Sequence, residues 1–469
     1  MSQQKAKIAV IGGGVAGSSV ALYLSQLGLD ITLFEKESSL VSGPPMCHLH
    51  AGGNLYREID DTQCIQLLKE SIELLRFYPY SIDFRPTLIA TPLEDPQEPT
   101  DILPRLELLK SEYEKLIQKD QKNKVLGEPQ NYYRLYSKED LQKAKKISIP
   151  QEIHSLDDWL IPVAKELDEK KIKFPLILVQ EYGLNVFRIA ASAWLLLQKS
   201  SQVKLKMGYE VKKIEKRANG FIIDNQEFDY LINAAGFKSG TIDDMLGIYR
   251  ERLVEFKAAY IAKWEKEQRL WPEVVFFGQR GTPQGMAQFT PYPDGYFQLH
   301  GMTKDITLFE DGLVKNSPLS AQPKLDKKFL NKIDNGWSFS VVEDRTKRAI
   351  DHVARFFPSF RDAQVTPKPL YGAQQIPGDD ANLRASEVSF EKERYARCEI
   401  VKASSILSMA DAITKELISL QLLSSASYGK REFNASKLLT PQEVTKEAKR
   451  LCKERDYPES LAKINIPKS

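Results

Sequence analysis

The chain has 469 residues, with 66 basic and 63 acidic side chains and a formal net charge of +3 at pH 7. This near balance argues against a nucleic-acid-binding protein, which would concentrate positive charge on one surface. The length favours two closely associated domains. No apolar run is long enough to span a bilayer, and the fold begins within the first ten residues, so we expect a cytoplasmic protein without a signal peptide.

The most informative segment is residues 7–36, KIAVIGGGVAGSSVALYLSQLGLDITLFEK. An apolar strand leads into three spaced glycines and a helix, and a second strand follows. Gly12 permits the tight turn, Gly14 lets a pyrophosphate approach the backbone, and Gly17 lets the helix pack close to the strand. We expect the free N–H groups at the start of this helix to bind phosphates, at Gly14, Val15, Ala16 and Gly17.

Glu35 ends the second strand, where its carboxylate can accept hydrogen bonds from both ribose hydroxyls of an adenosine. The same carboxylate would repel a 2′-phosphate. Strand, glycines, helix, second strand and terminal acid occur in the required order, which predicts dinucleotide binding.

Downstream segments alternate between helical and strand patterns, without internal repeats. We expect a helix at about 62–77, charged helical segments inserted between 91 and about 173, a meander of strands within 203–236, an antiparallel sheet within 252–309, a helical region at 327–357, an apolar helix at 405–423 and a charged helical tail.

The four cysteines, Cys47, Cys64, Cys398 and Cys452, lack the spacing of metal ligands, so we expect no metal site. Their small number fits a reducing compartment. We interpret them as small buried side chains.

An NAD-dependent dehydrogenase would continue with a regular second series of βα steps. Here a loop with two histidines, residues 42–54, follows the first unit, and the strand and turn DYLINAAGFKSG lie far downstream. This combination resembles the D-amino-acid-oxidase superfamily of FAD-dependent oxidoreductases.

The resemblance implies an α/β fold in which an FAD-binding Rossmann-like domain, doubly wound and three-layered, is interleaved with an antiparallel-sheet substrate domain. We expect the first domain in residues 1–75, 176–246 and 366–430, the second in 76–175 and 247–365, and a helical tail in 431–469.

The resemblance also assigns FAD contacts, which are carried by Gly12, Gly14, Gly17, Glu35, Lys36, Val211 on an adenine-contacting strand at 209–214, Ala235, Gly236 and Gly372. In place of the family's last glycine-rich turn, this chain has Lys402, Ala403, Ser404 and Ser405. Ser404 or Ser405 can cap the following helix, whose N-terminal dipole would stabilise negative charge on the reduced flavin. Lys402 can add a positive charge there.

In this family the flavin ring lies against the antiparallel sheet and accepts a hydride at N5. The sheet candidates for substrate contact are Tyr260, Arg280, Gln288, Tyr292 and His300, with Tyr296 and Gln298 nearby. His300 is our first choice for a general base, because an imidazole titrates near neutral pH. Arg252, Lys257 and Arg280 are candidates to hold a substrate carboxylate.

The loop at residues 46–56 contains His50, Ala51 and Gly52, which resemble the sequence by which the dimethylglycine and sarcosine dehydrogenase branch attaches its flavin. We therefore expect His50 either to be bonded covalently to the flavin or to pack against it, in a catalytic role, with Ala51 and Gly52 contacting the cofactor.

These features predict an FAD-dependent oxidoreductase that acts on a small amino acid, hydroxy acid or related amine. Two alternatives stay open, a flavin-dependent monooxygenase or halogenase and a flavin-binding protein without turnover. Oxygen and a quinone both remain possible electron acceptors.

Overall fold

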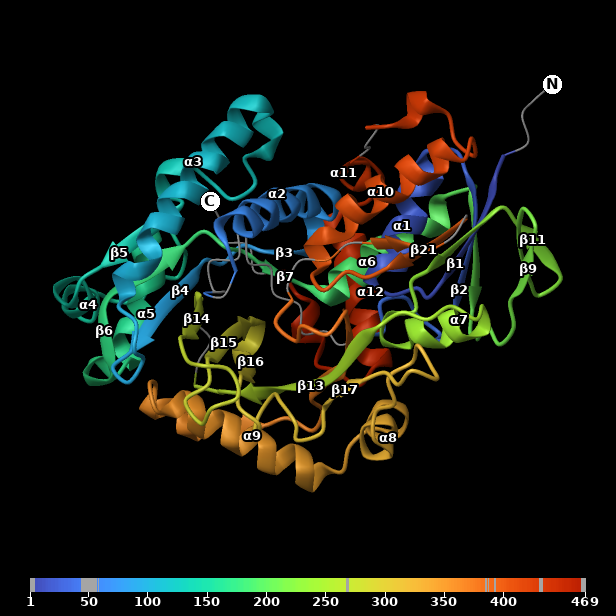
Figure 1. Cartoon of the computed structure of the whole chain (residues 1–469). Coiled ribbons are helices and arrows are strands. Elements are labelled where there is room, and N and C mark those ends of the chain that lie inside the picture. Colours follow the sequence, from blue (N-terminus) through green and yellow to red (C-terminus); the bar gives the residue numbers. More distant parts are fainter. Residues whose placement is uncertain are drawn as a thin grey trace.

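The computed structural model describes residues 5–43, 57, 59–266, 270–383, 386, 388–391, 394–429 and 433–464. Two sheets organise the chain (Figure 1), a parallel one among the labels α1, β1 and β2 and a larger one that includes β13 to β16. No helix in the described part of the chain is long and apolar enough to cross a membrane.

The first sheet has six strands in the order β20-β21-β12-β1-β2-β8. Neighbours from β21 to β8 pair in parallel, whereas β20 pairs antiparallel with β21. The central strands are almost wholly apolar, as expected for parallel strands covered on both faces. Their bounds are β1 (Lys7–Ile11), β2 (Asp30–Glu35), β8 (Val203–Met207), β12 (Tyr230–Asn233), β20 (Val388–Phe390) and β21 (Tyr395–Cys398).

Different elements cover the two faces of this sheet. On one face, α1 (Val15–Gln26) packs against α6 (Val186–Lys199) and α10 (Ile406–Ser419). On the other face lie the meander β9 (Glu215–Arg217), β10 (Gly220–Ile223) and β11 (Gln226–Phe228) and helix α7 (Ser239–Met245). The expected three-layer α/β domain is confirmed.

The second sheet runs β17-β13-β16-β15-β14-β4-β6-β5, and β18 and β19 also pair with β13. All its pairs are antiparallel except β14 with β4. Its strands are β4 (Thr87–Pro92), β5 (Tyr133–Tyr136), β6 (Ile172–Val179), β13 (Arg252–Lys263), β14 (Glu273–Phe276), β15 (Ala287–Tyr292), β16 (Tyr296–Gly301), β17 (Leu313–Lys315), β18 (Gln364–Val365) and β19 (Leu370–Pro377).

One face of the second sheet is apolar and covered by α9 (Phe339–Ala354), the orange helix below β15 and β16 in Figure 1. Phe276, Phe289 and Phe297 on this face contact aromatic rings that follow α9, and most of these contacts are tilted or edge-on. The opposite face carries Ala259, Ile261 and Val275, which join the core cluster of the nucleotide-binding side. The second sheet therefore turns one face toward the first sheet and its helices.

The remaining helices are α2 (Asp61–Phe77), α3 (Leu103–Lys119), α4 (Lys138–Ala144), α5 (Leu160–Glu166), α8 (Lys327–Asn335), α11 (Ala435–Leu438) and α12 (Pro441–Glu454), and β3 (Ile82–Asp83) pairs with β7 (Gly183–Leu184). Asp60 caps α2 by accepting the N–H of Gln63 at 2.7 Å. The helices expected at 62–77, 327–357 and 405–423 are present, with a break between α8 and α9. The inserted region is not purely helical, because β5 and the first two residues of β6 belong to the large sheet.

The domain division drawn from the sequence stays a prediction. Its boundary between residues 175 and 176 falls inside β6. Strand β19, expected in the nucleotide-binding domain, pairs along its whole length with β13 of the large sheet.

Candidate active site

The glycine turn holds β1, α1 and the end of β12 in backbone contact. Gly12 has φ +99°, and a Cβ atom there would lie 2.4 Å from the carbonyl oxygen of Ala234. A Cβ atom on Gly17 would lie 1.8 Å from the carbonyl oxygen of Gly12. Both glycines are therefore required by close backbone approach.

Gly14 differs from these two, because a Cβ atom there would meet nothing within 4 Å. Gly14 is the N-cap of α1, and no side chain caps this end. The first N–H groups of a helix have no partner within it, so the backbone of Val15, Ala16 and Gly17 offers donors beside open space. This arrangement fits the phosphates of a dinucleotide.

Glu35 braces the same turn from the end of β2. Its carboxylate accepts the N–H of Gly13 at 2.5 Å and the N–H of Glu37 at 2.8 Å. Burial raises the pKa of Glu35, and the two backbone donors oppose this shift. The expected ribose contact stays a prediction, and Lys36 beside it is exposed and pairs with Glu37 at 3.1 Å.

Val211 lies near this edge of the parallel sheet. The expected strand at 209–214 is wrong, since the chain is irregular between β8 and β9. The N–H of Tyr209 donates to the carbonyl of Glu35 at 2.8 Å, which fixes the segment beside β2. The Val211 side chain is buried, and its backbone groups bond no other residue that the structure describes. They fit the edge of an adenine.

Ala235 and Gly236 follow β12 next to the glycine turn, because Asn233 pairs with Ile11 in register. Ala235 donates its N–H to the side-chain oxygen of Asn233 at 3.2 Å, and Gly236 has φ +58°. The short 3₁₀ helix η8 (Gly236–Lys238) contacts β19. Gly372 lies in that strand, opposite Lys257 of β13.

Strand β19 also contacts the turn before α10. Gln374 donates to the carbonyl of Val401 at 2.9 Å, and Gln375 donates to the carbonyl of Cys398 at 2.7 Å. The segments containing Gly236, Gly372 and Lys402 are thus linked through one strand. The structure brings these three sequence-predicted cofactor segments together.

The expected cap of α10 is wrong. Ser405 occupies the N-cap position, but its hydroxyl donates to Glu70 of α2 at 2.7 Å instead of accepting a helix N–H. Ser404 is buried and makes no cap either. Sequence reasoning missed Glu70, because this contact joins residues 335 positions apart.

The face of the large sheet that is turned toward the first sheet is polar along β15 and β16. Strand alternation and register put six residues on this side, with Gln288 opposite His300, Thr290 opposite Gln298 and Tyr292 opposite Tyr296. We call them the polar face. The intervening residues, such as Phe289 and Leu299, point to α9. Three of the expected substrate residues, Gln288, Tyr292 and His300, therefore share one surface.

Two charged residues that the sequence analysis missed extend the polar face. Gln288 donates to Glu273 of β14, and the other oxygen of Glu273 pairs with Arg85 at 3.0 Å. Arg85 is 2% exposed, and its Nε and Nη1 atoms have no hydrogen-bond partner among the residues that the structure describes. The buried hydroxyl of Thr290 likewise bonds no described residue. The signal in the sequence was a charge at the edge of an apolar strand, in RPTLIA and EVVF.

Gly183 holds the Arg85 guanidinium in place. A Cβ atom on Gly183 would lie 1.7 Å from Nη1 of Arg85, so the guanidinium lies against the β7 backbone. Only a glycine leaves room for this contact.

The expected substrate contact of Tyr260 is wrong. It alternates onto the opposite face of β13, where its hydroxyl accepts a hydrogen bond from Arg345 of α9 at 2.7 Å. Arg280 and Lys257 both pair with the buried carboxylate of Glu255, at 2.7 Å for Lys257. Their charge is thus partly balanced within the protein.

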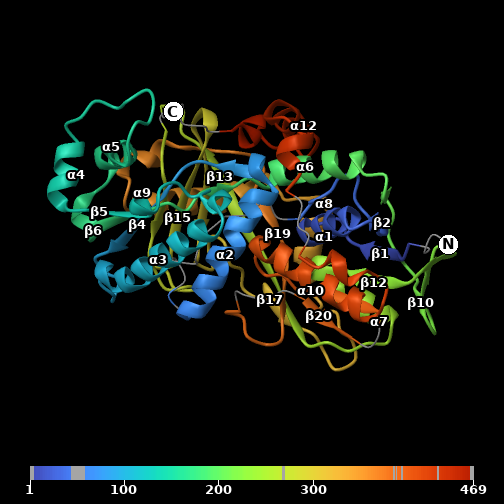
Figure 2. The ribbon, with the colours of Figure 1, turned by 90° about the horizontal axis from the view of Figure 1, so that it is seen from above.

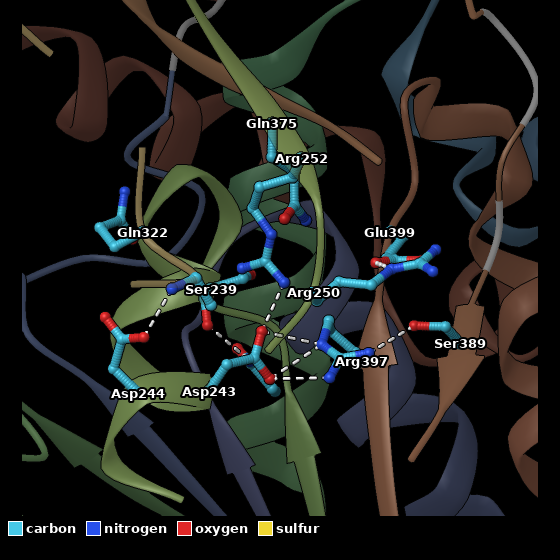
Figure 3. A network of polar contacts seen from close by, with 12 residues as sticks. Ser239, Asp243, Asp244, Arg250, Arg252, Gln322, Gln375, Ser389, Arg397 and Glu399 are labelled. Carbon is cyan, nitrogen blue, oxygen red and sulfur yellow. Dashed lines mark hydrogen bonds and ion pairs between the residues drawn. The ribbon is translucent and has the colours of Figure 1, made fainter. Parts of the chain in front are cut away.

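Arg252, the remaining candidate for a substrate carboxylate, belongs to a buried network instead (Figure 3). Asp243 of α7 is fully buried and pairs with Arg252 and with Arg397 of β21, at 2.9 Å for Arg397. Tyr395 donates to the same carboxylate at 2.7 Å. This network ties the start of β13 to the parallel sheet.

The remaining residues considered in the sequence analysis either lie outside the described part of the chain or are buried in the core. His50, Ala51, Gly52 and Cys47 lie outside the described part of the chain. The three remaining cysteines are buried free thiols, and burial raises the pKa of Cys64 to about 11. His352 is buried and contacts the carbonyl of Gly285 at 2.9 Å.

Comparisons with known proteins agree with this geometry. Residues 7–165 match the family described as FAD dependent oxidoreductase. No curated protein matches the sequence.

Similar solved structures include glycine oxidase from Geobacillus kaustophilus, with 12% identity, a TM-score of 0.54 and coverage of 91% of this chain and 100% of that one. L-alpha-glycerophosphate oxidase from Mycoplasma pneumoniae with FAD bound has 16% identity, a TM-score of 0.55 and coverage of 92% and 98%. L-amino acid deaminase from Proteus vulgaris has 13% identity, a TM-score of 0.56 and coverage of 94% and 96%. At these identities the likeness shows the fold. Together, the glycine turn, the family match over residues 7–165 and the shared fold make the chain similar to the FAD-dependent oxidoreductases of the D-amino-acid-oxidase superfamily, and the cofactor that this likeness supports is FAD.

Proposed function

We propose that the protein oxidises a small amino acid or hydroxy acid, in which the carboxylate group is recognised. FAD, when bound, supplies the acceptor for the hydride at N5. The observation that supports this substrate class is the row of polar side chains across β14, β15 and β16, which ends in the buried guanidinium of Arg85.

Arg85 is suited to a carboxylate because part of its donor fork is unused. Glu273 engages Nη2, while Nε and Nη1 are buried and bond no residue in the described part of the chain. A buried donor without an acceptor costs roughly 1–3 kcal/mol, and a carboxylate oxygen that accepts from Nη1 removes this cost for that atom. Arg85 therefore holds the substrate carboxylate, and Glu273 fixes the orientation of the guanidinium.

His300 and Tyr292 supply the remaining polar functions. His300 is half-buried and lies opposite Gln288, which bonds Glu273. A neutral imidazole there takes the proton from the substrate ammonium or hydroxyl as the hydride leaves. Burial raises the pKa of Tyr292, so its hydroxyl stays protonated and donates a hydrogen bond.

The proposal includes the FAD contacts assigned from the sequence. The phosphates lie at the start of α1, the ribose at Glu35 and Lys36, the adenine at Val211, and the ring beside Ala235, Gly236, Gly372 and residues 402–404. His50 is bonded to the ring or packed against it. Release of all flavin on denaturation would eliminate the covalent form.

The electron acceptor and the cellular location of the protein are also part of the proposal. The described cysteines are free thiols, which supports the expected cytoplasmic location. Oxygen and a quinone are both kept as acceptors, and stopped-flow reoxidation with each would separate them.

The test is anaerobic mixing of the FAD-loaded protein with 2-amino acids, 2-hydroxy acids and the matching amines and alcohols without a carboxylate. We expect loss of flavin absorbance with a carboxylate-bearing compound and much slower loss with its partner. Bleaching only by NAD(P)H would instead support a monooxygenase, and no bleaching by any donor would support a protein without turnover.

Two variants examine Arg85 itself. Arg85→Lys keeps the charge but loses the fork, and Gly183→Ala displaces the guanidinium by steric contact. We expect both to raise KM for the acid about 10- to 100-fold, the value of a charged hydrogen bond. Arg134→Lys, at a half-exposed arginine on β5, is the matched control. Unchanged discrimination between acid and amine in both variants would refute the role.

A further inference from the structure

Glu70 places a buried carboxylate at the start of α10. The residue is 2% exposed and lies on α2, which packs against α10 and the turn before it. One oxygen accepts from Ser405 at 2.7 Å. The other accepts from Ser408 at 3.0 Å and from Gln66 at 3.0 Å. Figure 2 shows α2 and α10 as neighbours.

Within the described ranges, no cation balances this carboxylate. Glu70 forms no ion pair with any residue that the structure describes, and its partners are two hydroxyls and an amide. A buried ionised group needs compensation. The N-terminus of α10 carries about half a positive charge, and both serine donors belong to its first turn. The helix dipole is therefore already engaged by an internal anion.

We propose that Glu70 lowers the reduction potential of the bound flavin. The inference rests on the proposed function, in which the flavin ring lies beside residues 402–404, just before the N-terminus of α10. Reduction adds negative charge to the ring, and this charge and Glu70 compete for the same helix terminus. Glu70 is a positioning residue, which acts on the flavin through Ser405 and α10.

The test is the midpoint potential of the FAD-loaded Glu70→Gln variant, measured by anaerobic reduction against a reference dye. Glutamine keeps the shape and removes the charge. We expect the oxidised-to-reduced ratio at a fixed potential to fall about tenfold, a shift of about +30 mV for two electrons. A role limited to joining α2 and α10 would change the melting temperature and leave the potential unmoved.

Glu416→Gln is the matched control, because it removes the same charge from the opposite end of α10, about 15 Å along the helix. We expect no shift in this variant. An equal shift in both variants would overturn the inference, since the effect would then not come from the helix start.

Gln66→Lys provides an independent variant if Glu70→Gln does not fold. An ammonium in place of the Gln66 amide neutralises Glu70 without removing it, so the potential is again expected to rise. A potential unchanged from wild type in a folded, FAD-loaded variant contradicts the inference. Failure of the wild-type protein to bind FAD would contradict the proposed function instead.

Discussion

The glycine turn and the polar face depend on different properties of their residues. At Gly12 and Gly17 the decisive feature is an absent Cβ atom, because neighbouring backbone oxygens occupy its place. On the polar face the decisive feature is charge and hydrogen bonding, in a row from Arg85 through Glu273 to Gln288. Substitutions in the turn should therefore act through volume, and those on the face through polarity.

The largest effect is expected from Gly17→Ala. Its methyl group would lie 1.8 Å from the carbonyl oxygen of Gly12, so α1 must move away from β1. We expect a loss of at least about 4 kcal/mol in the free energy of unfolding and no FAD binding. Thermal unfolding and flavin absorbance measure the two effects.

Gly14→Ala is the comparison within the same turn. Its methyl group meets no protein atom within 4 Å, so we expect a stability change of about 1 kcal/mol or less. The methyl group would occupy the space into which the phosphates approach, and FAD affinity should fall. Wild-type affinity would show that the phosphates lie elsewhere.

Asp243→Asn should have the next largest effect, because Asp243 joins the parallel sheet to the large sheet. The variant leaves Arg252 and Arg397 buried without their carboxylate. We expect a loss of about 3–5 kcal/mol in the free energy of unfolding, measured by denaturant titration. Asp344→Asn removes an exposed carboxylate from its pair with Arg348 and should cost less than about 0.5 kcal/mol. Similar losses in the two variants would be inconsistent with the network in Figure 3.

The smallest effects are expected from pH, with opposite signs at Glu35 of the glycine turn and at His352 of α9. Burial raises the pKa of Glu35, so its contribution to stability is present below the unfolded value of 4.5 and is lost as pH rises through the folded value. Burial lowers the pKa of His352, so its contribution is present above the unfolded value of 6.5 and is lost as pH falls through the folded value.

Melting temperatures of Glu35→Gln and His352→Gln across pH test these signs. Relative to Glu35→Gln, the wild-type protein should lose stability as pH increases from 4.5. Relative to His352→Gln, it should lose stability as pH decreases from 6.5. Differences that are flat with pH would mean that neither group is perturbed by burial.

The sequence predicted those parts of the fold that are encoded by neighbouring residues. The β1-turn-α1-β2 unit lies within residues 7–36, and the helices followed from local periodicity. The cofactor segments at 236, 372 and 402 were predicted through the resemblance to the family. The structure joins them through β19.

Features that depend on strand register or distant contacts were not predictable. Tyr260 and Gln288 both lie in strands, but only the pairing of β13, β15 and β16 puts them on opposite faces. The contact of Ser405 with Glu70 spans 335 residues and displaces the expected helix cap. A single sequence carries no signal for such pairs.

The most direct test of the account is a crystal structure of the FAD-loaded protein grown with acetate. We expect the pyrophosphate to contact the first N–H groups of α1, and the acetate carboxylate to accept from Nη1 of Arg85 on the polar face. A flavin ring on the α9 side of the large sheet, or acetate bound away from Arg85, would contradict it.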